Sequence, residues 1–90
     1  MKLREIYRSP NYYSICECDR IDSHVIYVIA GGALMYEVVV KLTPDDFHEF
    51  EASGHLDKLA YQIAQGHSDF VLRQLKPDTP VERIEFVTNF

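Results

Sequence analysis

The chain has 90 residues, of which 47% are hydrophobic and 26% charged, and its formal net charge is -5 at pH 7. This length and composition predict one folded domain spanning residues 1–90, with a single core. The negative charge argues against nucleic acid or an anionic membrane as a partner, because both select basic surfaces. No apolar run approaches the roughly 20 residues of a membrane-spanning helix, and no hydrophobic signal segment follows Met1. We therefore expect a cytoplasmic protein, bacterial in style.

Two strands are predicted before residue 21. The loose alternation of residues 2–8 indicates a first, edge strand, and residues 12–20 a second, separated by the turn signal Ser9-Pro10-Asn11. Cys16 and Cys18 share one face of the second strand. A disulfide across one intervening residue would be badly strained, so we expect reduced thiols that pack as small hydrophobes. The alternative is a zinc site with His24, but zinc thiolates are usually spaced more widely and need four ligands. We predict no metal and no cofactor.

The centre of the chain is a predicted hairpin. Two apolar runs, 25–30 and 33–42, flank Gly31-Gly32, and a Gly-Gly pair supplies the positive φ angles of a two-residue turn. In this register Ala30 opposes Ala33, and Tyr27 opposes Tyr36. Since side chains alternate between faces, one face collects only apolar and tyrosine side chains. This core face contains Val25, Tyr27, Ile29, Leu34, Tyr36, Val38, Val40 and Leu42.

Helices follow the hairpin. Thr43 suits an N-cap and Pro44 the first helical position, so a helix is predicted from there to Ala52 or Ser53, before Gly54. Residues 56–63 have the spacing of a second amphipathic helix, which Gly66 ends. Residues 70–75 fit either a short helix capped at 67–69 or a strand, and both remain open. After the proline-containing segment 76–80, the alternation of 81–87 predicts a last strand.

The order of strands, helices and a final strand predicts an α+β domain: an antiparallel sheet of four or five strands with two or three helices packed on one face. The helices would cover the core face. The other sheet face would then present a contiguous apolar patch, which soluble monomers seldom expose. Either a segment of the chain covers this patch, or it is an interface with a second copy or another protein. The patch consists of Ile26, Val28, Met35 and Val39.

The first predicted helix begins an acidic stretch without Lys or Arg. It contains Asp45, Asp46, Glu49, Glu51 and Asp57. One interpretation is a solvated helix whose first-turn acids interact favourably with the helix dipole. The other is a docking face for a basic protein, where complementary charge would speed association and select the partner.

No catalytic motif with a recognisable spacing occurs, so no residue is assigned a catalytic role. The hypothesis we favour is a non-catalytic interaction module, homodimeric or bound to another protein, that uses the outer sheet face, the acidic helix or both. The alternative is a small enzyme or ligand-binding domain with a pocket between sheet and helices. Tyr27 and Tyr36 would line this pocket, together with His48 or His55, which have acidic neighbours suited to acid–base chemistry.

One segment resembles a known class of proteins. The run Leu42-Thr-Pro-Asp-Asp-Phe47, followed by Phe50, Gly54, Leu59-Ala60 and Ile63, is similar to a pattern of small bacterial α+β proteins. Some of these are uncharacterised, and some are of the immunity-protein type that neutralises a toxin. The resemblance implies a small binding protein and adds toxin neutralisation as a third hypothesis. Its positions are caps and helix core, so it transfers no binding residue.

Overall fold

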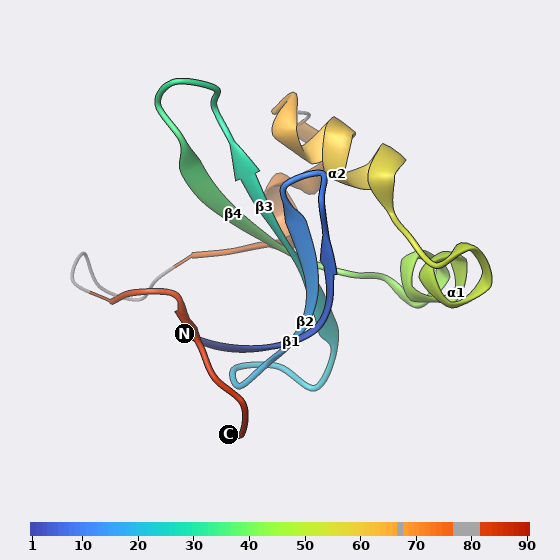
Figure 1. The fold of residues 1–90 in the computed structure, drawn as a ribbon, viewed down its shortest axis with the longest axis vertical. Coiled ribbons are helices and arrows are strands. Elements are labelled where there is room, and N and C mark those ends of the chain that lie inside the picture. Colours follow the sequence, from blue (N-terminus) through green and yellow to red (C-terminus); the bar gives the residue numbers. More distant parts are fainter. Residues whose placement is uncertain (67, 77–81) are drawn as a thin grey trace.

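The strands predicted in the first half of the chain form the centre of a β-sheet in the computed structural model, which describes residues 1–66, 68–76 and 82–90. The strands are β1 (Lys2–Ser9), β2 (Tyr13–Cys18), β3 (His24–Ala30), β4 (Tyr36–Lys41), β5 (Gln74–Leu75) and β6 (Glu85–Phe86). Between β4 and β5 lie α1 (Pro44–Ser53), α2 (Asp57–Ala64) and the 3-10 helix η1 (Ser68–Arg73) (Figure 1).

The six strands form one mixed sheet in the order β5-β4-β3-β2-β1-β6. Neighbours from β1 to β5 are antiparallel, whereas β6 is parallel to β1 and pairs with its first residues. The mixed α+β class is therefore as expected, but the sheet is larger than predicted and not purely antiparallel. For residues 70–75 both predicted alternatives occur in part, because residues 70–73 belong to η1 and residues 74–75 form β5. Residue 67 of the predicted cap and the start of the predicted strand 81–87 lie outside the described residues.

The register of the central hairpin differs from the predicted one. Ala30 pairs with Tyr36 and Tyr27 with Val39, so β4 has slipped by three positions relative to β3. Gly31 and Gly32 both have positive φ, as predicted, but residues 31–35 form a five-residue connection. The Leu34 N–H donates to the Gly31 carbonyl at 3.1 Å. The Tyr36 ring packs over Gly31: a Cβ built there would lie 2.6 Å from Tyr36 Cδ1. Because Gly31 has no side chain, Tyr36 can occupy the position opposite Ala30.

A slip by an odd number of residues moves every β4 side chain to the opposite face relative to β3. On the helix side, Val38 and Val40 therefore lie opposite Val28 and Ile26. Tyr27 and Val39 lie together on the other face. The predicted core face, which combined Tyr27 with Tyr36 and Val38, is wrong.

The two ends of α1 lie where the capping signals predict. Thr43 is the N-cap of α1: its hydroxyl accepts from Asp46 N–H at 3.1 Å, and Asp46 Oδ2 accepts from Thr43 N–H at 3.0 Å. Gly54, in the left-handed conformation, ends the helix. Apolar residues of α1, α2 and η1 all pack against the same face of the sheet, so the helices cover one face, as expected.

The second face is concave and also buried. The rings of Tyr27 on β3 and Phe86 on β6 are only 5.0 Å apart. In a flat sheet these strands, three positions apart, would be separated by roughly 14 Å. The sheet therefore curls toward this face and encloses a second core. It contains Met1, Leu3, Cys16, Cys18, Val25, Tyr27 and Val39, with Ile84 packed against them. Both cysteines are free and buried, as expected. No helix in the described part of the chain is long and apolar enough to cross a membrane.

Candidate interaction surface

The four residues predicted as an outer apolar patch do not form one. Ile26 and Val28 are buried beneath the helices, and Val39 is buried in the concave core. Only Met35 is exposed, in the connection after β3. The prediction is wrong because the slipped register separates these residues onto different faces. The sequence left open whether the chain itself or a partner covers the sheet face opposite the helices. In the structure, residues of the chain itself bury this face.

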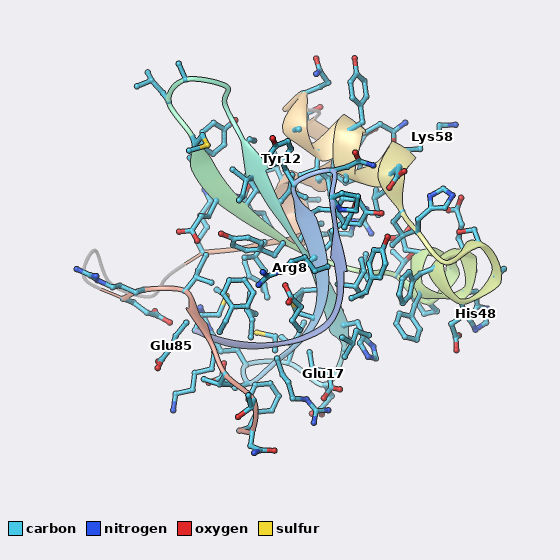
Figure 2. All side chains as sticks on the ribbon, viewed as in Figure 1. Arg8, Tyr12, Glu17, His48, Lys58 and Glu85 are labelled. Carbon is cyan, nitrogen blue, oxygen red and sulfur yellow. The ribbon has the colours of Figure 1, made fainter. Side chains whose placement is uncertain are left out.

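The pocket predicted between sheet and helices is not assembled. Tyr27 lies in the concave core, where its hydroxyl donates to Glu37 at 2.6 Å. Burial and this hydrogen bond raise the pKa of Tyr27 well above its ordinary value. Tyr36 is exposed at the hairpin end. His48 is exposed on α1 (Figure 2). His55 is exposed in the connection to α2. The predicted lining residues therefore occupy separate places, and the sheet separates Tyr27 from both histidines.

The predicted zinc alternative is not assembled either. Cys16 and Cys18 lie in the concave core, whereas His24 stacks on Phe47 at 4.0 Å between ring centroids. Phe47 belongs to α1 and packs on the helix-side core. The thiols and the imidazole therefore point to opposite sides of the sheet.

The acidic helix is divided between a structural and a solvent-facing part. Asp46 accepts from Arg73 Nη1 at 2.7 Å, which ties α1 to η1. Burial opposes ionisation of this carboxyl, but hydrogen bonds from Arg73 and Thr43 outweigh it and lower the pKa of Asp46. Asp45 and Glu49 are exposed. Of the three predicted contact residues on α1, Asp46 is thus engaged within the fold, and the other two face solvent.

Three consecutive large apolar side chains are exposed at the end of the β3–β4 hairpin. Leu34 is 86% exposed, Met35 72% and Tyr36 52%. Leu34 and Met35 lie in the five-residue connection, outside strand pairing, and Tyr36 is the first residue of β4, paired with Ala30. Soluble proteins rarely present several adjacent large apolar side chains to water without a function.

Two tyrosines on other elements are also exposed. Tyr12, 71% exposed, lies in the β1–β2 turn, and its carbonyl accepts from Ile29 N–H at 3.0 Å, next to the hairpin end. Tyr61, 66% exposed, lies on α2. It shares a helical stripe with Asp57, one turn earlier, and Asn11 beside Tyr12 donates to Asp57 at 3.2 Å.

The figures agree with this arrangement. The hairpin connection, the β1–β2 turn and α2 lie toward the same end of the long axis (Figure 1). Tyr12 projects between hairpin and helix in that view (Figure 2). We call this set the apolar end: Tyr12, Leu34, Met35, Tyr36 and Tyr61.

Sequence reasoning identified only part of the apolar end. Met35 was predicted as a contact residue, but on the wrong surface, and Leu34 and Tyr36 were predicted as core. The missing signal was the length of the hairpin connection. Comparison with models of known protein families, with curated protein sequences and with solved structures finds no match. The candidate surface therefore rests on the exposure and placement of its own residues.

Proposed function

We propose that the protein is a non-catalytic interaction module that forms a homodimer through its apolar end. The observation that supports this most is the exposure of Leu34, Met35 and Tyr36 at the hairpin end. Burying such side chains against a partner removes apolar surface from water, which is the main driving force of association. Tyrosine and methionine are also among the residue types enriched in interfaces.

Charge favours the apolar end over the acidic helix as the contact between two copies. The chain carries a net charge of -5, so two copies repel each other in general. A contact between two α1 helices would place the exposed carboxylates of Asp45 and Glu49 against the same groups of the partner. The side chains of the apolar end are uncharged, so they can meet their own copies without such a cost.

Molar mass in solution tests the proposal. Size-exclusion chromatography with light scattering at micromolar concentration should give twice the monomer mass of 10.5 kDa. The Leu34→Ser/Met35→Ser variant should elute as monomer, since serine is tolerated in an exposed connection. A wild-type protein that stays monomeric at this concentration contradicts the homodimer.

A second candidate contact is the exposed part of α1. Asp45 and Glu49 would suit a basic protein, and the toxin-neutralising hypothesis is of this kind, differing only in the partner. Pull-down from the native cell with wild type and Asp45→Asn/Glu49→Gln tests it. A partner lost with this variant but kept by Leu34→Ser/Met35→Ser would assign binding to the acidic helix instead of the apolar end.

A further inference from the structure

The sulfur-containing side chains differ sharply in their access to solvent. The chain has two cysteines and two methionines. Cys16 and Cys18 are buried in the concave core, and Met1, only 8% exposed, packs in the same core. Met35 is 72% exposed, in the connection between β3 and β4. Because oxidation of sulfur follows exposure, a small oxidant in water reaches the Met35 thioether first.

The chemistry of the thiols strengthens this selectivity. A cysteine reacts with a peroxide as the thiolate. Burial, followed by the nearby Glu5 and Cys18, raises the pKa of Cys16 to about 12, so its thiolate is scarce at neutral pH. A thioether has no proton to lose, so access alone decides which methionine is oxidised. That access favours Met35 over Met1.

Oxidation by hydrogen peroxide would make the Met35 side chain polar. The sulfur supplies the electron pair of a new S–O bond, the O–O bond breaks, and the second oxygen leaves as water. The sulfur thereby loses two electrons, which reduce the peroxide. The product is methionine sulfoxide, and methionine sulfoxide reductases reverse the step. In that reversal a dithiol supplies two electrons and two protons, and the oxygen leaves as water.

Met35 lies in the middle of the exposed run at the hairpin end. Leu34, 86% exposed, precedes it, and Tyr36, 52% exposed, follows it. A sulfoxide buried in a contact between such apolar side chains loses its hydrogen bonds to water. In a two-fold dimer each copy contributes the same residue, so this cost arises twice.

We propose that Met35 is a selective oxidation site, and that its reversible conversion to the sulfoxide by a peroxide dissociates the homodimer. This inference rests on the proposed contact through the apolar end. The loss of two buried thioethers, each replaced by an unsatisfied polar group, should raise the dissociation constant of the dimer at least about tenfold.

The dimer itself should slow the oxidation. A contact through the apolar end covers Met35, so peroxide reacts with the monomer that exchanges with the dimer. The rate constant for oxidation of Met35 should therefore fall as the protein concentration rises above the dissociation constant. Leu34→Ser weakens the contact but keeps Met35, so its oxidation rate constant should not depend on protein concentration in the same range.

The central experiment treats the protein with hydrogen peroxide at neutral pH. Peptide mass spectrometry should find one added oxygen atom on Met35 while Met1 and both cysteines are unmodified. Light scattering at a fixed concentration should show dimer before treatment and monomer after it. The two methionine sulfoxide reductases, one for each sulfoxide epimer, should restore the dimer when supplied with a dithiol. Met35→Leu keeps an apolar side chain without sulfur, so it should remain dimeric in peroxide.

The outcomes separate this inference from the proposed dimer. A wild-type protein that is monomeric before treatment contradicts the dimer, and the oxidation switch with it. A dimer that persists after Met35 is oxidised overturns the inference and leaves the dimer intact. The same holds if Met1 or a cysteine is oxidised ahead of Met35, or if peroxide dissociates Met35→Leu as it does the wild type. Thermal unfolding before and after treatment confirms that each sample is folded.

Discussion

Ala30 pairs with Tyr36 across β3 and β4, and this pairing decides which side chains of the hairpin remain in solvent. It places Tyr36 over Gly31 and leaves Leu34 and Met35 in the connection. The same register buries Ile26 and Val28 beneath the helices. The apolar end therefore exists because the turn is longer than two residues.

The two glycines of the connection test this register. Gly31 and Gly32 both have positive φ, so alanine strains the backbone at either position by about 1–2 kcal/mol. At Gly31 the added Cβ would also lie 2.6 Å from the Leu34 carbonyl and from the Tyr36 ring, whereas at Gly32 it meets nothing within 4 Å. We expect Gly31→Ala to lower the free energy of unfolding by about 1–2 kcal/mol more than Gly32→Ala. Urea denaturation measures both, and equal losses would contradict the packing of Tyr36 over Gly31.

A tyrosine hydroxyl caps α2. Leu56, the N-cap, offers no polar side chain, and its buried N–H donates to the Tyr13 hydroxyl at 2.8 Å. That hydroxyl also donates to Asp57 at 2.6 Å. Tyr13→Phe leaves the Leu56 N–H without its acceptor, so we expect a loss of about 1–3 kcal/mol in the free energy of unfolding.

Tyr27→Phe is the matched control for that substitution. Tyr27 is also buried and also donates to a carboxylate at 2.6 Å, but its partner Glu37 is exposed and can bind water instead. We expect a loss below about 1 kcal/mol. If Tyr27→Phe proves as costly as Tyr13→Phe in urea denaturation, the capping role of Tyr13 is refuted.

The Asp46–Arg73 contact predicts a pH dependence. The pKa of Asp46 is lowered in the folded state, so the unfolded chain takes up the proton first as the pH falls. The stabilisation is therefore present above the ordinary Asp pKa of about 4 and is lost progressively below about pH 5. Asp46→Asn should lower stability at neutral pH and flatten the decline between about pH 5 and pH 3. Asp45→Asn, at an exposed carboxyl, is the control, and an unchanged decline in Asp46→Asn would contradict the assignment.

The buried thiols predict chemical inertness. Burial, followed by the nearby Glu5 and Cys18, raises the pKa of Cys16 to about 12. The thiolate is the reactive form, so Cys16 should not react with an aromatic disulfide reagent in the native protein at mildly alkaline pH. Cys18 is also buried. Both thiols should react when urea unfolds the chain, and rapid labelling of native protein would contradict their placement in the concave core.

The helix boundaries could be predicted from the sequence because capping is local. Thr43, Pro44 and Gly54 specify the ends of α1 through contacts within a few residues. The hairpin register could not be predicted in the same way. Val38, Val39 and Val40 are apolar in succession, so either face of β4 could turn to the helices, and alternation gives no information there.

The curl of the sheet, strand β6 and the placement of the exposed tyrosines depend on contacts between segments that are far apart in the sequence. The curl of the sheet, which brings Phe86 to Tyr27, buries a face that a flat sheet would expose. The strand β6 has two residues and is held by pairing with β1, so its own sequence predicts little. The exposed set of Tyr12 and Tyr61 likewise forms only when the β1–β2 turn meets α2.

Sedimentation velocity over a concentration series tests the proposed homodimer most directly. The comparison includes the wild type, Leu34→Ser/Met35→Ser, and Leu72→Ser as a control that removes another exposed leucine. We predict that wild type and Leu72→Ser dimerise with the same dissociation constant, while the hairpin variant remains monomeric. Dimerisation of the hairpin variant with the wild-type constant would contradict a contact through the apolar end.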